Sequence, residues 1–275
     1  MREKTYIFAK YLLNIMVISL LTDFGDVYPA SMKGVILNID PAANIVDISH
    51  YVPRHDVQAG AFMLMACARY FPYGTVHIAV VDPGVGTQRR CIAIMSGSRG
   101  FGIHYFVGPD NGLLIPAARS IGEPEVYEIT NKKLFNPEVS STFHGRDIFA
   151  PVGAHISKGM NIADAGLRIS EFVDLDFGKG KKMGNAVESR VIFIDEFGNI
   201  ITNISSDIVS FQPGEIMEME NKRVVFQRSY GFCKECEPLA LIGSHGYLEI
   251  AVNRGNAATF FNKKHGDEIF INRSP

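Results

Sequence analysis

The stretch TVHIAVVDPGVGTQRRCIAIM, residues 75–95, places two apolar runs on either side of a glycine-rich turn. Runs that are apolar nearly throughout are typical of strands buried on both faces of a sheet. The first run ends at Asp82, and Arg89 follows seven residues later, just before the second run begins. The pattern predicts a strand, a tight turn and a second strand, with Arg89 brought back beside Asp82 at the carboxyl end of the first strand.

On both sides of this stretch, from residue 16 to 172, short apolar runs alternate with helical patterns. Residues 56–71 have apolar side chains at helical spacing and are followed by a proline, which stops a helix. Such alternation is typical of an α/β domain with a mostly parallel sheet between helices. The expected strands are 17–21, 44–49, 75–81, 91–95, 103–108 and 126–130, and the expected helices are 30–37, 56–71, 113–120 and 146–158.

The composition changes after residue 172. Residues 173–185 are rich in glycine, lysine and aspartate and are interpreted as a linker. Beyond them, short strand-like runs separated by turn signals, without a convincing helix, predict a small all-β barrel or sandwich domain over residues 186–275. Its expected strands are 187–194, 199–204, 215–219, 223–226, 239–243, 247–252, 258–261 (ATFF) and 268–271.

The bulk properties exclude several classes of function. The 275 residues carry a net charge of −2 without a basic tract, which argues against a nucleic-acid partner. Residues 1–15 form an expected N-terminal arm, too interrupted by Lys10 and Asn14 for a signal peptide or a membrane span, so we expect a cytoplasmic protein with no membrane partner. Cys233 and Cys236 have CxxC spacing, but no second ligand pair accompanies them, so no metal is expected.

Polar residues follow five of the expected strands, and ligands of open α/β sheets bind beyond such strand ends. Each position also has a plain interpretation as turn chemistry, because Asp and Asn beside Gly favour turns. Together they favour a polar ligand. The five segments are TDFGD (22–26), Asp82, PDNG (109–112), DEFGN (195–199) and SHGY (244–247).

A chemical role is indicated most directly by Asp82, Arg89 and His144. A guanidinium beside Asp82 can keep its carboxylate ionised. His144 stands in TFHGRD, just before an expected helix, where a histidine can also be an ordinary surface residue. An aspartate, an arginine and a histidine at one pocket would be able to activate water.

Seven segments, in order and across both expected domains, resemble the S-adenosyl-L-methionine (SAM) hydroxide adenosyltransferase family, the sister family of the fluorinases and chlorinases. A single glycine loop would be weak evidence, whereas seven segments in register are highly specific. They are TDFG (22–25), HxVPRHDVxxGA (50–61), FPxGTVHxAVVDPGVGTxRR (71–90), PDNGLL (109–114), TFHGRD (142–147), DxFGNxxTNI (195–204) and SHGYLEIAVN (244–253).

The resemblance implies an enzyme that needs no cofactor and that hydrolyses SAM to adenosine and L-methionine through attack of water on ribose C5′. It also implies the (R)-sulfonium epimer as a candidate substrate. The expected assembly is a homotrimer, with each active site between the α/β domain of one subunit and the β-barrel of its neighbour.

Carried over by position, the resemblance assigns the handling of water to Asp82, Arg89 and His144. Our hypothesis is that Asp82 and Arg89 orient and polarise the water while His144, whose ordinary pKa is about 6.5, accepts or relays its proton. The residues matched to substrate binding are Asp23 for the ribose, Asp195 and Ser244 for methionine, Asn199, Val252 and Asn253 for adenine, Phe197 and Tyr230 as stacking walls, and Tyr247 and Glu249 nearby.

Two alternatives stay open at this point. A non-catalytic adenosine- or SAM-binding protein would share the pocket without needing Arg89 and His144. A SAM-dependent halogenase is less favoured, because the sister enzymes have a tyrosine in place of Asp82, a serine in place of Gly145 and an insertion where residues 96–102 are short.

Overall fold

The computed structural model describes residues 16–208 and 210–273, so the expected N-terminal arm, residues 1–15, lies outside the described residues. The chain divides into two compact units between Leu175 and Asp176. Each unit has its own sheet and its own apolar core.

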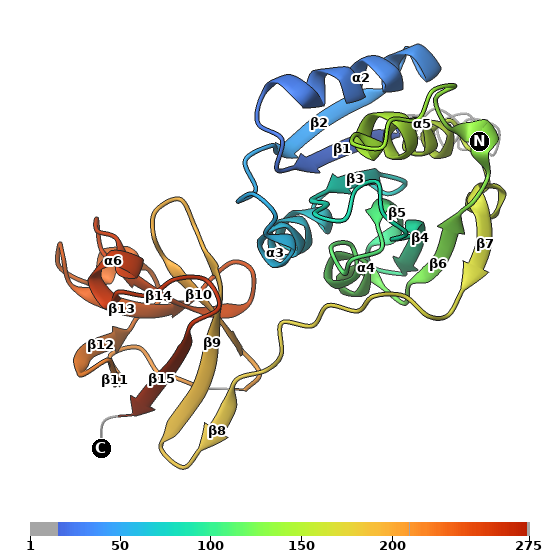
Figure 1. Ribbon diagram of the computed structural model, residues 1–275. Coiled ribbons are helices and arrows are strands. Elements are labelled where there is room, and N and C mark those ends of the chain that lie inside the picture. The colour runs from blue at the N-terminus through green and yellow to red at the C-terminus, as the bar shows by residue number, and fades with distance from the viewer. Residues whose placement is uncertain (1–15, 209, 274–275) are drawn as a thin grey trace, which may run out of the picture. The chain divides into compact units, whose positions relative to one another are not determined.

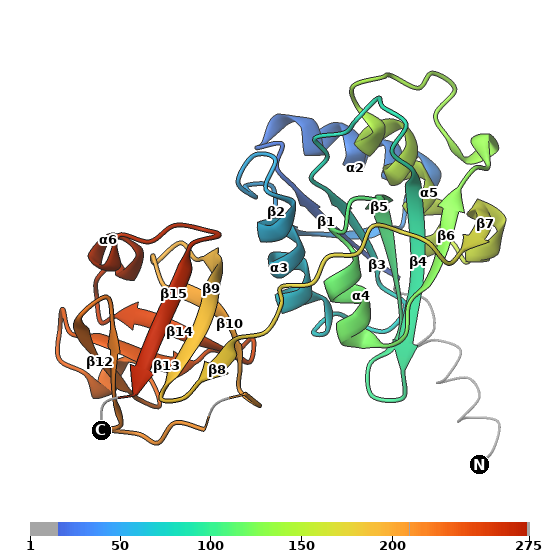
Figure 2. The same cartoon turned by 60° about the horizontal axis from the view of Figure 1, so that its bottom comes forward.

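The first unit is built on a seven-stranded sheet with the order β2-β1-β3-β5-β4-β6-β7 (Figure 2). Its strands β2, β1, β3 and β5 are parallel neighbours, and the other three strands join the β5 edge by antiparallel pairing. The strands are β1 (Val17–Thr22), β2 (Asn44–Ser49), β3 (Val76–Val80), β4 (Cys91–Ser98), β5 (Gly102–Pro109), β6 (Glu125–Ile129) and β7 (Gly166–Ile169).

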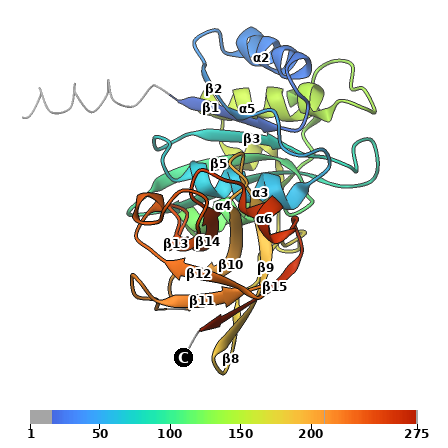
Figure 3. The same ribbon diagram turned by 90° about the vertical axis from the view of Figure 1, so that its left-hand side faces the viewer.

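Helices cover both faces of this sheet (Figures 1 and 3). The pair α2 and α5 packs on one face and the pair α3 and α4 on the other, so the parallel strands are buried between them. Five of the seven strands run in the same direction, and the predicted α/β domain with a mostly parallel sheet is confirmed. The helices are α2 (Val27–Ile39), α3 (Val57–Ala68), α4 (Ile115–Ile121) and α5 (Ala150–Ser157), with short turns η1 (Lys132–Leu134), η2 (Gly145–Phe149) and η3 (Ile162–Ala165).

The order of the strands places a topological switch point between β1 and β3. The chain leaves β1 toward β2 on one side, whereas β3 continues the sheet toward β5 on the other side. Open α/β sheets bind ligands in the crevice outside the carboxyl ends of strands at such a point. Asp23, which directly follows β1, and Asp82, which follows β3 after Val81, are therefore at the expected position for a site.

The second unit is a closed seven-stranded β-barrel, as the sequence predicted. The strands follow the order β10-β14-β13-β12-β11-β15-β9, and β9 pairs with β10 to close the barrel, while β8 extends β9 at the margin. Barrel closure leaves few unpaired strand edges. The elements are β8 (Lys181–Met183), β9 (Ala186–Ile194), β10 (Ile200–Ser205), β11 (Ile216–Met219), β12 (Lys222–Phe226), η4 (Tyr230–Phe232), β13 (Pro238–Ile242), β14 (Tyr247–Val252), α6 (Ala257–Phe261) and β15 (Glu268–Arg273).

One strand prediction in this unit is wrong. The segment 258–261 (ATFF) lies in the helix α6, although its threonine and phenylalanines suit a strand. The helix begins because the side chain of Asn256 accepts a hydrogen bond from the backbone N–H of Thr259, which is an N-cap. Phe261 then packs into the barrel core. Two short strands, β7 and β8, were not predicted, since they are largely exposed and lack a long apolar run.

Candidate active site

The turn after β3 is folded as the sequence predicted. The backbone N–H of Val85 donates to the carbonyl of Asp82, and that of Thr87 donates to the carbonyl of Gly84. Gly86 has φ +76°, and a Cβ added there would lie 2.1 Å from the backbone oxygen of Ser141. A glycine is therefore required at this position for both its backbone conformation and its close contact. The contact joins the turn to the loop that carries His144.

This turn brings Arg89 back to Asp82. The Arg89 Nε lies 2.9 Å and 3.0 Å from the two carboxylate oxygens of Asp82, and Nη2 donates to Oδ2 as well. Nη2 also lies 2.8 Å from Nδ1 of His144. The side chains of Asp82 and Arg89 are 4% and 11% exposed, so the ion pair is largely shielded from water. The predicted contact between Asp82 and Arg89, with His144 near, is confirmed.

All five N–H groups of the Arg89 guanidinium have an acceptor. Nε and one Nη2 hydrogen donate to Asp82, and the second Nη2 hydrogen donates to His144. Nη1 lies 3.4 Å from the carbonyl of Arg90 and 3.0 Å from Sγ of Cys91. An arginine has no acceptor atom, so it must be the donor in each of these bonds. Nδ1 of His144 is consequently unprotonated, and the proton of the neutral ring is on Nε2.

The pKa of His144 is lowered, first by partial burial and then by the positive charge of Arg89. Both effects favour the neutral ring. The loop that holds His144 is organised by Asp147, whose buried carboxylate accepts bonds from the Ser140 backbone, the Asn136 amide and the Arg146 guanidinium. The residues 145–149 form one π-helical turn, a feature that is frequent at functional sites.

Asp23 is held at the end of β1 by the segment 50–55. Its Oδ2 accepts a hydrogen bond from the backbone of His55 at 2.9 Å, and the carbonyl of His50 accepts the N–H of Gly25. The preceding residue, Thr22, lies 2.9 Å from Nδ1 of His50 through its hydroxyl. Asp23 thus remains partly exposed, with its second oxygen Oδ1 able to accept further hydrogen bonds.

The strand end after β5 has a structural role instead. The Asp110 carboxylate is buried, pairs with Arg90 at 2.7 Å and accepts the backbone N–H of Val173. The side-chain amide of Asn111 donates to the carbonyl of Val81 at 2.8 Å. These contacts secure the residue that precedes Asp82, and they leave Asp110 turned into the protein.

On the barrel, a pocket of about 570 Å³ contains five of the predicted binding residues. Asp195 organises its rim, because one carboxylate oxygen accepts the backbone N–H groups of Phe197 and Asn199 and the other accepts the Asn199 amide at 2.9 Å. Since Asn199 donates through Nδ2, its Oδ1 is the remaining acceptor. The residue Phe197 is 78% exposed. The pocket is lined by Phe197, Asn199, Tyr230, Val252, Asn253, Arg254 and Gly255.

A buried carboxylate fixes one wall of this pocket. The Tyr230 hydroxyl donates to Glu249 at 2.5 Å, and burial and this hydrogen bond raise the pKa of Tyr230. The other oxygen of Glu249 lies 3.4 Å from Nε2 of His245. Burial also raises the pKa of Tyr247, which lies outside the pocket lining, as does the exposed Ser244.

The two domains of one family account for most of the chain. Family models for the N-terminal and C-terminal domains of the SAM hydroxide adenosyltransferases match residues 18–166 and 189–270. This chain belongs to the SAM hydroxide adenosyltransferase family. The resemblance seen in the sequence is confirmed.

Similar proteins support the same family. A protein named (R)-S-adenosyl-L-methionine hydrolase from Salinispora tropica is 37% identical over 92% of this chain and 97% of its own length. One of the same name from Methanocaldococcus jannaschii is 38% identical over 93% and 95%. A crystal structure of an uncharacterized conserved protein from Thermotoga maritima has a TM-score of 0.84 at 38% identity and covers 93% of this chain and all of that one. A fluorinase from an Actinoplanes species is a more distant relative, 28% identical over 94% and 98%.

The sequence did not reveal the contact that Cys91 makes with the cluster of Asp82, Arg89 and His144. Its apolar neighbours suggested a core residue, and it does pack against the core, but its sulfur also contacts Arg89. Strand alternation alone could not show this contact, because Cys91 is the first residue of β4 and follows the turn directly. Cys233 has a packing role: it lies against the apolar cluster of Leu239, Leu241 and Ala251.

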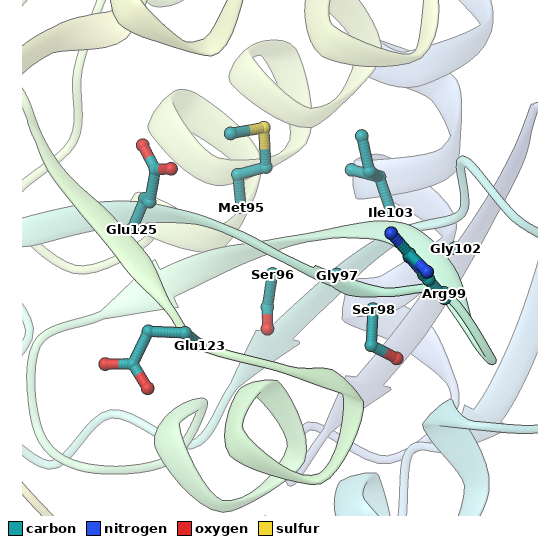
Figure 4. Close-up of a pocket in the computed structure, with 9 residues that line it drawn as sticks. All are labelled: Met95, Ser96, Gly97, Ser98, Arg99, Gly102, Ile103, Glu123 and Glu125. Atoms are coloured by element: carbon teal, nitrogen blue, oxygen red, sulfur yellow. The ribbon is translucent and has the colours of Figure 1, made fainter.

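The first unit also has a hollow at the β4–β5 hairpin, where the parallel strands begin (Figure 4). This hollow does not include Asp82, Arg89 or His144. Figure 4 shows Met95 and Ile103 on one side of the hairpin and Ser96 and Glu123 on the other. Across residues 16–208 and 210–273, no three His, Cys, Asp or Glu side chains form a possible metal site. Among the same residues, no helix has the length and apolar character of a membrane span.

Proposed function

We propose that this protein hydrolyses SAM, including its (R)-sulfonium epimer, to adenosine and L-methionine. The single observation that carries the proposal is the contact chain of Asp82, Arg89 and His144 at the topological switch point, which is suited to hold one water. The names of the relatives from Salinispora tropica and Methanocaldococcus jannaschii support the same substrate.

The reaction needs little acid–base chemistry. The water oxygen attacks ribose C5′, the C5′–S bond breaks, and its electron pair stays on sulfur as the neutral thioether of methionine. The leaving group therefore requires no proton. What the site must supply is in-line alignment, which can contribute on the order of 7–11 kcal/mol, and an acceptor for the proton of a water whose pKa is about 15.7 in bulk.

The hydrogen-bond directions favour Asp82, rather than His144, as that acceptor. Nδ1 of His144 already accepts from Arg89, and Nε2 of the neutral ring carries a proton. His144 can therefore donate to the water oxygen but cannot take a proton without giving up Arg89. Asp82 can accept from the water, and a weak base is sufficient because the water becomes strongly acidic as its oxygen bonds to carbon. This division of roles replaces the proton relay through His144.

The residues around the barrel pocket, together with Asp23, suit the rest of the substrate. We assign the ribose hydroxyls to Asp23 and the adenine 6-amino group to Oδ1 of Asn199, with Phe197 and Tyr230 as stacking walls. Asp195 keeps a lone pair on Oδ2 for the methionine ammonium, and Ser244 is the second methionine contact. Glu249 fixes Tyr230.

The backbone of Val252 and Asn253, expected to face adenine, already makes hydrogen bonds within the barrel. The carbonyl of Val252 accepts the N–H of Gly255, and the N–H of Asn253 donates to the backbone carbonyl of Glu237. We therefore assign these two residues to the pocket wall by shape. The homotrimer with active sites shared between neighbouring subunits, and the cytoplasmic location, stay proposals that follow from the resemblance and the sequence.

The test is incubation of the purified protein with each sulfonium epimer, with chromatography for adenosine and with a parallel reaction in added chloride. Adenosine from at least one epimer is expected, without 5′-chloro-5′-deoxyadenosine. SAM binding without product would establish the non-catalytic alternative instead.

Two variants separate the roles. His144→Gln keeps a donor and an acceptor in the side chain and is expected to retain far more activity than Asp82→Asn, which loses the proton acceptor and about 10²–10⁴-fold in rate. Equal losses of rate in both variants, together with a pH profile that changes only in His144→Gln, would support the proton relay through His144 instead.

A further inference from the structure

The guanidinium of Arg89 is held on three sides. Asp82 and His144 occupy the edge that faces the proposed water, and the ring of Phe149 lies under the guanidinium with its centroid 5.3 Å from Cζ. The opposite edge is held by Cys91, the first residue of β4, and by Arg90, the residue before it. Of the two acceptors there, the carbonyl of Arg90 is the more distant, at 3.4 Å, and Sγ of Cys91 is at 3.0 Å.

The position of this sulfur is set by the sheet. Cys91 is the first residue of β4 and is registered against Pro109 of β5, while its neighbour Ile92 pairs with Glu128 of β6. Its side chain also packs against the apolar core of the first unit. The thiol is therefore held by the sheet itself, whereas Asp82 lies in the turn after β3 and His144 is the N-cap of the short helix η2.

We propose that Cys91 is a positioning residue of the active site: its sulfur accepts Nη1–H of Arg89 and thereby keeps Nη2 directed at both Asp82 and His144. The proposal rests on the proposed hydrolase function. Nη2 must serve two acceptors at once, and a small rotation of the guanidinium would lengthen one of those two bonds. An acceptor at the far edge opposes that rotation.

A neutral sulfur suits this task. Burial raises the pKa of Cys91, so the group remains a thiol beside Arg89. A thiol can accept an N–H bond without bringing a second negative charge, which would compete with Asp82 for the guanidinium. A serine hydroxyl has the same capacity as an acceptor, whereas valine has a similar volume and no acceptor.

The experiment compares Cys91→Val, Cys91→Ser and wild type, with Cys67→Val as the control, since Cys67 is a half-buried cysteine on α3, outside the site. In steady-state hydrolysis of SAM, Cys91→Val is expected to lower kcat about fivefold, the value of one hydrogen bond, with KM unchanged. Cys91→Ser is expected to recover most of the loss, and Cys67→Val to match wild type.

A second readout does not depend on turnover. In ¹⁵N–¹H spectra of the arginine side chains, the Arg89 Nη hydrogens are expected to be resolved in wild type and Cys91→Ser and to average in Cys91→Val. Unchanged kcat and an unchanged Arg89 spectrum in Cys91→Val would overturn the proposal, as would an equal loss in Cys91→Ser. Absence of adenosine with the wild-type protein would instead refute the proposed function, leaving the spectra to decide on Cys91.

Discussion

A buried histidine pair should make the first unit sensitive to acid. His77 on β3 and His104 on β5 have no exposed surface, and their rings are stacked with Nε2 of His77 3.1 Å from Nδ1 of His104. His104 Nε2 lies 3.1 Å from the carbonyl of Phe101, and Nδ1 of His77 lies 2.6 Å from the hydroxyl of Ser19. A carbonyl only accepts, so the bonds run in one direction from Ser19 to Phe101, with both rings neutral.

The cost of charging this pair can be estimated for His77. Burial, and then the neighbouring His104, lower the pKa of His77 from 6.5 to about 3. At 1.36 kcal/mol for each pH unit, the full difference corresponds to about 5 kcal/mol of unfolding free energy. The unfolded chain takes up the proton below pH 6.5 and the folded chain only near pH 3, so stability is complete above pH 6.5 and declines as the pH falls. Between pH 7 and 4.5, the expected loss is about 2–3 kcal/mol.

The perturbation that isolates this effect is His77→Gln, which keeps an acceptor and a donor but does not titrate in this range. The variant is expected to be less stable than wild type at pH 7 and to lose less stability on acidification. Urea unfolding at pH 7, 6, 5 and 4.5 gives the two curves, and their difference should shrink by roughly 2–3 kcal/mol across the series. Parallel curves would refute the reasoning, because the neutral state of His77 would then contribute nothing to the pH dependence.

Two further predictions concern the site. Gly86→Ala should lower the unfolding free energy by more than about 1 kcal/mol and reduce kcat, because φ is +76° and the added Cβ meets the Ser141 oxygen. The control in urea unfolding and activity assays is Gly100→Ala, since Gly100 has open space around it. Equal stability of the two variants would contradict the argument. Asp195→Ala should raise KM for SAM about tenfold with little change in kcat, since the Asn199 amide loses the partner that orients it. An unchanged KM in steady-state kinetics would show that Asp195 has no part in substrate recognition.

The sequence was most informative where one strong local signal decided the structure. The apolar runs at 17–21 and 75–81 could be buried on both faces only in a covered sheet, and the glycines after Asp82 left few ways to continue except a reversal. The segment 258–261 was misjudged because its aromatic residues suit either a strand or a helix. Only the cap by Asn256 and the packing of Phe261 decide for the helix.

The roles within the site depended on information that no local pattern contains. The unprotonated Nδ1 of His144 follows from the direction of one bond to Arg89, which comes from a segment 55 residues away. The contact of Arg89 with Cys91, and the burial of Asp110 against Arg90, depend likewise on how neighbouring strands are registered. The residues were therefore predictable as a set, whereas the donor and acceptor of each pair required the three-dimensional arrangement.

The complete use of the Arg89 donors has a consequence for anion selectivity. A halide that replaced the water would need N–H or O–H groups to compensate for its lost hydration, and Arg89 directs all five of its own to acceptors within the protein. The positive charge of Arg89 is also balanced locally by Asp82, whose carboxylate would repel an anion at short range. Water, being neutral and both donor and acceptor, meets neither obstacle, so under the proposed function we expect this ion pair to favour water over chloride.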